Sequence, residues 1–411
     1  GRRGLWLDPP VTMAQDATSR TPGDAPASPP ARLESLDALR GFDMFWIMGA
    51  DAIGGAFLKM GTPLAAEAGP AAAPASGALV RAAHFLGEQL EHVEWEGFRF
   101  YDLIFPLFVF MAGVSLVLSL SRTVAQEGRG VATGRLLRRA LLLYLVGIFY
   151  YGGIGKGWDQ VRLLGVLQRI ALAYLGAGLC FLHLKPRGLV TALAVILLGY
   201  WGLMALVPVP GIGAGHYAEG RNLANWIDAQ YLPLRKWDGD HDPEGLLSTL
   251  PAIGSCLLGV LAGIHLRTGR GTGVRRAATL VGVGLALVAA GHLWGVWFPV
   301  IKKLWTSSYV LVAGGWSAVL LGVFHYGVDI RGWRGWCRPF VWIGLNPIAI
   351  YLLTNLVNFD ALSRRFVGGE VVTFLDGVFP GLALLALALL GIGWGVWVAW
   401  YLDRRRVYLR L

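Results

Sequence analysis

Three ionisable residues in or beside apolar stretches could do acid–base chemistry. His92 lies just before a long apolar stretch, and Asp102 follows it ten residues later. A free imidazole titrates near neutral pH and can take a proton from a nucleophile, provided that a carboxylate or carbonyl orients its second nitrogen. Asp51 lies inside an earlier apolar stretch, with no basic residue one helical turn away. His92, Asp51 and Asp102 are therefore the candidate catalytic residues, although His92 could instead be a plain neighbour of the interfacial Trp95.

Other polar residues inside apolar stretches also need partners, because an ionisable group at membrane depth costs at least about 2.5–3.5 kcal/mol to insert. Arg40 and Asp43 are three residues apart, so we expect them to share a helix face and neutralise each other. Arg169 requires a carboxylate, a carbonyl or an anionic ligand, and Asp51 and Asp102 are the available carboxylates.

The elements that position these residues are predicted to be membrane-spanning helices. Only 15% of the 411 residues are charged and 55% are apolar, whereas a soluble domain carries about 25% charged residues. A span needs about 20 mostly apolar residues. This pattern predicts an all-α, polytopic membrane bundle of about ten helices, at 37–58, 99–121, 136–153, 163–184, 188–207, 245–266, 277–298, 307–327, 339–358 and 375–402.

The distribution of Lys and Arg predicts the orientation. If the N-terminus is cytoplasmic, the inner segments hold 22 basic residues and the outer segments 11, as the positive-inside rule requires. Both termini are then cytoplasmic. We expect residues 1–34, which are rich in Pro, Ala, Asp, Ser and Thr, to form a disordered cytoplasmic tail, and 35–411 to form one membrane domain. Met13 is a candidate natural start.

Several function classes find no support in the sequence. The net charge of +10 is placed in short loops that set topology, so no nucleic-acid partner is expected. The three cysteines are widely separated and no metal-ligand spacing occurs, so no metal is expected. The sequence also lacks a P-loop and a nucleophile elbow.

Five blocks in order resemble the heparan-alpha-glucosaminide N-acetyltransferases and their bacterial relatives, a family of polytopic sugar acetyltransferases that use acetyl-CoA. Rare residues such as Trp, Pro and Gln inside the blocks make the resemblance specific. The blocks cover about residues 33–360 and are Ser35–Asp43, His92–Gly97 continuing into Asp102–Pro106, Val161–Arg169, Pro299–Tyr309 and Gly344–Pro347.

The resemblance implies an active site at the periplasmic face of a bacterial inner membrane, reached by acetyl-CoA from the cytosol. It places the family's catalytic histidine at His92. It also places a polar residue, generally Asn in the lysosomal enzymes, at Asp51. We expect the large lumenal domain and extra helix of the lysosomal enzymes to be absent, and therefore a small amino sugar or glycan, not heparan sulfate, to be the acceptor.

Acetyl transfer also needs donors for the developing thioester oxyanion and cations for the CoA phosphates. The candidate donors are Trp305, Ser308, Tyr309 and Asn346. Arg40 and Arg169 complete the expected cofactor-binding set, with further candidate arginines at 135, 138, 139, 275 and 276.

Several alternatives remain open at this point. The chain could O-acetylate envelope glycans, or it could be a sugar transporter, because a polar track through a helix bundle also serves transport. Direct transfer and an acetyl-histidine intermediate are both compatible with the sequence. So are a monomer and a homodimer.

Overall fold

The apolar stretches of the sequence form helices, because a backbone in lipid must satisfy its own hydrogen bonds. The computed structural model describes residues 33–61, 78–155, 157–269 and 271–409. Its long helices are α1 (Glu34–Gly61), α3 (Phe100–Glu127), α4 (Arg129–Tyr150), α5 (Val166–His183), α6 (Pro186–Leu206), α8 (Thr249–Thr268), α9 (Gly273–Trp294), α10 (Ser307–Phe324) and α15 (Leu382–Arg404). The expected tail 1–34 falls almost entirely outside the described residues.

Shorter helices connect the long ones. They are α2 (Ala78–Gln89), α7 (Leu223–Tyr231), α11 (Arg338–Leu345), α12 (Pro347–Leu356), α13 (Phe359–Ser363) and α14 (Glu370–Val378), with a 3-10 turn η2 (Trp158–Gln160) and a π-helical turn η3 (His325–Ile330) that extends α10.

The helical, multi-span class predicted from the sequence is confirmed. Within the described residues, seven helices are long and apolar enough to cross a membrane, or eight if α11 and α12 count as one bent span. Helices α1 and α4 are also long, but α1 carries several acidic residues and α4 carries four arginines. The count of ten spans, with both termini on one side of a membrane, stays a prediction.

Two predicted spans are not continuous helices. The stretch 339–358 breaks between α11 and α12, which meet at 82°. Pro347 is the first residue of α12 and cannot donate the backbone hydrogen bond that would continue α11. The stretch 375–402 is divided between α14 and α15, and Gly381 at the junction has a positive φ of 86°, which glycine adopts readily.

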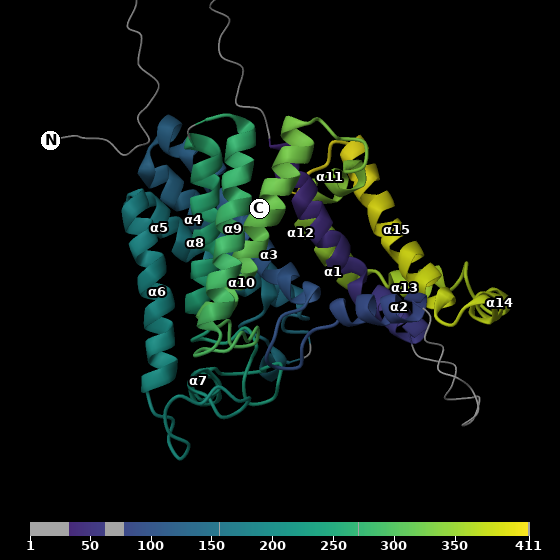
Figure 1. Ribbon diagram of the computed structural model, residues 1–411, viewed down its shortest axis with the longest axis horizontal. Helices are drawn as coiled ribbons and strands as arrows, with labels where there is room; N and C mark the ends of the chain where they lie inside the picture. The colour runs from purple at the N-terminus through teal and green to yellow at the C-terminus, as the bar shows by residue number, and fades with distance from the viewer. Residues whose placement is uncertain (1–32, 62–77, 156, 270, 410–411) are drawn as a thin grey trace, which may run out of the picture.

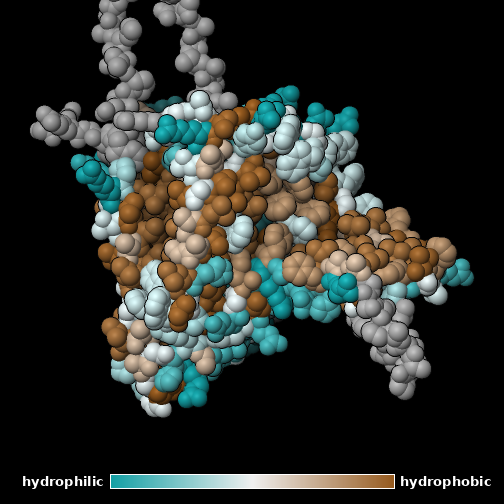
Figure 2. Space-filling view, in the orientation of Figure 1, coloured by the Kyte–Doolittle hydropathy of each residue, from teal (hydrophilic) through white to brown (hydrophobic). Residues whose placement is uncertain are grey.

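The long helices stand side by side (Figure 1), and the bundle has two distinct ends. At one end, here called the terminal face, α1 begins and α15 ends. At the other, the loop face, lie α2, α7 and the connections around them. Figure 2 shows apolar residues over the sides of the bundle and hydrophilic residues at both ends, as expected for a chain embedded in lipid.

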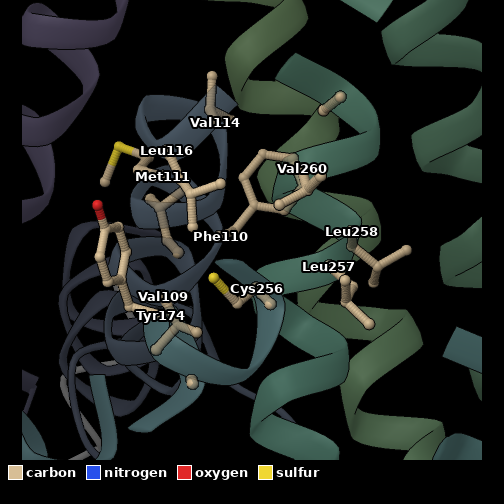
Figure 3. Packing of buried hydrophobic residues seen from close by; sticks show 14 of the residues in the cluster. Val109, Phe110, Met111, Val114, Leu116, Tyr174, Cys256, Leu257, Leu258 and Val260 are labelled. Atoms are coloured by element: carbon tan, nitrogen blue, oxygen red, sulfur yellow. The ribbon is translucent and has the colours of Figure 1, made fainter. Parts of the chain in front are cut away.

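The centre of the bundle is the contact between α3 and α8 (Figure 3), where Phe110 and Met111 of α3 lie beside Cys256 and Val260 of α8. Glycines allow the two backbones to approach. A Cβ at Gly259 would lie 1.9 Å from the Phe110 carbonyl oxygen. Small residues have this role in membrane helix packing, and the rigid pair fixes the start of α3, where Asp102 lies.

Candidate active site

His92 lies in the short loop that joins α2 to α3 at the loop face. Its side chain is half exposed, whereas that of Asp102, in the first turn of α3, is fully buried. His92 Nδ1 is 2.9 Å from Asp102 Oδ1. Since a carboxylate accepts, this contact assigns the imidazole proton to Nδ1 and leaves the Nε2 lone pair facing away from Asp102.

Asp102 also holds the loop that carries His92. Its second oxygen, Oδ2, accepts the backbone N–H of Arg99 at 3.1 Å and that of Val93 at 3.4 Å. The first of these bonds satisfies a donor at the N-terminus of α3, as a helix cap does. The Asp102 carboxylate therefore caps the N-terminus of α3, holds the backbone of the loop and orients the imidazole.

A lysine from a distant segment completes this cluster. The connection between α9 and α10 runs beside the His92 loop, with Glu96 and Ile301 forming an antiparallel bridge and the Gly97 N–H donating to the Val300 carbonyl at 2.9 Å. This pairing brings Lys302 Nζ to 3.1 Å from His92 Nε2, 2.8 Å from Nδ1 and 3.4 Å from Asp102 Oδ1.

Burial and nearby charged groups shift the pKa of Lys302. Burial lowers the pKa of Lys302 below its usual value, although the nearby carboxylates of Asp102, Glu244 and Asp51 act in the opposite direction. The lysine therefore loses its proton at a lower pH than an exposed lysine.

Asp51 contacts this cluster through Tyr101. The Tyr101 ring stacks on the His92 ring, with centroids 4.3 Å apart and planes 6° apart. The Tyr101 side chain in turn hydrogen-bonds Asp51. The three residues predicted to be catalytic thus lie together, with Asp102 touching His92 directly and Asp51 acting one residue further away.

Three cavities follow one another between the two faces, and the His92 cluster lies between the last two. An inner cavity of about 350 Å³ opens near the terminal face, and a central cavity of about 220 Å³ shares the walls Phe108, Ile170 and Ile348 with it. An outer cavity of about 360 Å³ lies at the loop face. The central and outer cavities share the walls His92, Val166, Glu244 and Lys302.

Two guanidinium groups line the inner cavity, those of Arg40 and Arg139, together with the Asp37 carboxylate. The expected Arg40–Asp43 pair does not form, because Arg40 bonds Asp37 at 3.1 Å and also the Ser115 hydroxyl. Asp43 is buried, and its carboxylate has no hydrogen-bond partner among the described residues. The guanidinium of Arg139 lies over the Tyr174 ring at 5.1 Å.

The central cavity is lined mostly by apolar side chains of α1, α3, α5 and α12, and the outer cavity by aromatic and charged ones. The outer walls include Trp95, Trp237 and Asp238. Arg162 stabilises the wall of the outer cavity through hydrogen bonds of 2.6 and 2.5 Å to the carboxylates of Asp242 and Glu244.

One carboxylate and histidine cluster at the loop face has the composition of a cation site. Glu219, Asp238 and His241 offer ligand atoms within 4.8 Å of one another. Lys303 Nζ lies 2.7 Å from Glu219 and 3.0 Å from Asp238, so an ammonium group already balances these carboxylates.

The predicted oxyanion donors Trp305, Ser308 and Tyr309 do not line these cavities, and their polar atoms have protein partners. The Trp305 indole donates to the Ser255 hydroxyl at 3.0 Å, and the Ser308 hydroxyl to the Pro299 carbonyl at 3.0 Å. The Tyr309 hydroxyl donates to the Asp102 backbone carbonyl at 2.7 Å. In the structure they form the scaffold that fixes the connection carrying Lys302 against the start of α3.

Arg169 and Asn346 also lie away from the His92 cluster. Arg169 is fully buried, lies 4.9 Å from the centre of the Trp305 ring and bonds the Ser248 hydroxyl, so neither Asp51 nor Asp102 is its hydrogen-bond partner. Asn346 holds the C-terminal segment, with its Nδ2 donating to the Val407 carbonyl at 2.9 Å. Neither residue lines any of the three cavities, and the expectation that they bind the cofactor finds no support in the structure.

Sequence reasoning missed Lys302, Tyr101 and Glu244 as residues of this site. Lys302 belongs to one of the five blocks, at 299–309. In the sequence alone, however, a lysine in a short loop is indistinguishable from an ordinary solvent-exposed lysine. Only the bridge between Glu96 and Ile301, 205 positions apart in the sequence, brings it to His92.

Comparison with known proteins identifies related chains. The family model described as "Heparan-alpha-glucosaminide N-acetyltransferase, catalytic" matches residues 79–279. The human protein named heparan-alpha-glucosaminide N-acetyltransferase is 31% identical over 64% of this chain, and the mouse protein of that name is 28% identical over 64%. The match covers 48% of each relative, so the chain spans about half the length of the curated relatives it matches. The relationship expected from the five blocks is confirmed.

Proposed function

We propose that this chain, a relative of the heparan-alpha-glucosaminide N-acetyltransferases, is a membrane acetyltransferase that moves an acetyl group from acetyl-CoA to the amine of an amino sugar. The observation that carries the proposal is the His92–Asp102 pair at the junction of the central and outer cavities. At that position a base meets both a donor held in one cavity and an acceptor held in the other.

The imidazole supplies the proton transfers. With Asp102 accepting from Nδ1, His92 Nε2 takes a proton from the acceptor amine as its nitrogen attacks the thioester carbonyl carbon. The C–N bond forms, the C–S bond breaks, and the proton on Nε2 passes to the CoA sulfur. The products are the N-acetylated sugar and the free thiol, and His92 returns to its starting state.

The inner and central cavities fit acetyl-CoA. Arg40 and Arg139 can pair with its phosphates, and the apolar central cavity can hold the acylated pantetheine arm. Ser115, which holds Arg40, lies 13 residues along α3 from Asp102, about 20 Å at 1.5 Å per residue. An extended phosphopantetheine arm can span that length, so the thioester would reach His92 while the phosphates stay near the terminal face.

The outer cavity fits an amino sugar. Trp95 and Trp237 offer ring faces to the sugar. Asp238 pairs with Lys303 and Glu244 with Arg162, and their carboxylate oxygens can also accept hydrogen bonds from sugar hydroxyls. The excess of basic residues in the segments of the terminal face orients that face toward the cytoplasm. We therefore place acetyl-CoA on the cytoplasmic side and the acceptor on the opposite side, which in a bacterial inner membrane is the periplasm.

Replacement of His92 tests the proposal. His92→Ala should leave acetyl-CoA affinity nearly unchanged but reduce N-acetylation of glucosamine roughly 10²–10⁴-fold, the usual contribution of a general base. Purified protein in detergent, radiolabelled acetyl-CoA and product analysis give the rate. The matched control is His84→Ala, which removes a half-exposed histidine of α2 that lines none of the three cavities.

The same preparation separates the alternatives. Direct attack leaves the protein unlabelled when acetyl-CoA is supplied without an acceptor, whereas a two-step reaction labels it at His92. Acetyl esters in place of amides would identify an O-acetyltransferase. Full activity in His92→Ala, or sugar movement across a membrane with no acetylated product, would refute the proposal.

A further inference from the structure

We propose that Lys302 is a catalytic residue that donates a hydrogen bond to the thioester carbonyl oxygen and stabilises the negative charge that forms there. The inference rests on the proposed acetyl transfer and adds the group that the transfer still requires, because attack on a thioester puts charge on the carbonyl oxygen.

The position of Lys302 fits this role. It lines both the central and the outer cavity. Its Nζ lies 3.1 Å from His92 Nε2, the atom that receives the amine proton. A reacting carbonyl must lie about 3 Å from both the nucleophile and its oxyanion donor, and Lys302 and His92 line the two cavities where these meet.

The other expected donors are occupied. Trp305, Ser308 and Tyr309 donate to protein acceptors, and Asn346 holds the C-terminal segment. Among the described residues that line the central cavity, Lys302 alone bears an ammonium or guanidinium group.

The carboxylates around Lys302 position its ammonium group and leave it able to donate a hydrogen bond to a ligand. Asp102 approaches from α3 at 3.4 Å, while Asp51 of α1 and Glu244 of the connection before α8 act at longer range. In the resting protein the ammonium lies 2.8 Å from His92 Nδ1 and 3.1 Å from Nε2. A bound thioester oxygen would accept a hydrogen bond from this ammonium and leave Nε2 able to accept the amine proton.

The step needs no further reactant. The amine nitrogen bonds to the carbonyl carbon, the carbonyl π electrons move onto oxygen, and the Lys302 N–H donates to that oxygen without transferring its proton. As the carbonyl re-forms, the C–S bonding electrons leave with the sulfur, which takes the proton held by His92. Lys302 is unchanged at the end.

The test compares Lys302→Met, Lys302→Arg and wild type in the N-acetylation assay with saturating acetyl-CoA and glucosamine. Lys302→Met should reduce kcat roughly 10²–10³-fold, the usual effect of deleting one oxyanion donor, with the Kd for acetyl-CoA changed only a few-fold. The remote control is Lys185→Met, at an exposed lysine that precedes α6 and lines none of the three cavities.

The pH profile distinguishes catalysis from a structural role. Because the donor must be protonated, wild-type kcat should fall as pH rises through the pKa of Lys302, which burial lowers. A guanidinium stays protonated, so in Lys302→Arg this alkaline limb should move to higher pH. If Lys302→Met fails to fold, the arginine variant alone decides.

Two results would overturn the assignment of Lys302 while leaving the proposed function intact. One is acetyl transfer by Lys302→Met within several-fold of wild type. The other is an alkaline limb in Lys302→Arg that coincides with that of wild type. Absence of transfer in wild type would instead refute the proposed function.

Discussion

At the scale of single residues, Asp102 has three structural tasks. Its carboxylate orients His92, accepts two backbone N–H groups and lies beside Lys302. Because these contacts converge on one buried side chain, removal of the carboxylate would disturb the imidazole, the loop and the lysine together. His92 is the more informative residue to replace, because the contacts described for its half-exposed ring are with side chains, whereas Asp102 also holds two backbone groups.

Asp51 gives a prediction at this scale. It acts on His92 through Tyr101, by a hydrogen bond that an amide oxygen can also accept. Asp51→Asn should therefore keep transfer within a few-fold of wild type. Asp51→Leu removes the acceptor, so transfer should fall up to about tenfold, the equivalent of one hydrogen bond of 0.5–1.5 kcal/mol. Steady-state rates of the two variants check this, and an equal loss in both would mean that the charge itself is required.

The single sequence brought out part of this site. His92, Asp102 and Asp51 could be selected because ionisable residues near membrane depth are costly and need a reason. Lys302 could not, since its approach to His92 depends on long-range backbone pairing between two loops. Trp305, Ser308 and Tyr309 belong to the right block, but the direction of their hydrogen bonds becomes known only from the packed structure.

At the scale of elements, the contact between α3 and α8 fixes the start of α3 and hence Asp102. Gly259→Ala should destabilise the protein by about 1–3 kcal/mol, the usual cost of overpacking a core, because the new Cβ would lie 1.9 Å from the Phe110 carbonyl oxygen. Thermal unfolding in detergent measures the effect. Gly199→Ala in α6 is the matched control, since no atom lies within 4 Å of its added Cβ. Equal melting temperatures for the two variants would contradict the close contact.

The helices themselves were largely predictable. Runs of about 20 apolar residues indicated where they lie, since apolar length is what a bilayer selects. The 82° bend between α11 and α12 was not predicted. Proline within a membrane helix is often tolerated when neighbours satisfy the freed backbone groups, so Pro347 alone does not distinguish a straight span from a broken one.

At the scale of the whole molecule, the three cavities lie in series between the two faces and share wall residues, with the His92 cluster between the last two. In the proposed reaction acetyl-CoA would stay on one side and the acceptor on the other, so that only the acetyl group would cross. In that reaction the arginines of the inner cavity would pair with the CoA phosphates, and the tryptophan rings of the outer cavity would pack against the sugar.

The most direct test of acetyl transfer through the bundle uses sealed proteoliposomes, in which the accessibility of a C-terminal tag reports the orientation of the protein. Acetyl-CoA is supplied only to the compartment at the terminal face, and glucosamine only to the compartment at the loop face. We predict N-acetylglucosamine in the glucosamine compartment, free CoA in the other, and neither product with His92→Ala. Product formation only when both substrates share one compartment would contradict transfer through the bundle.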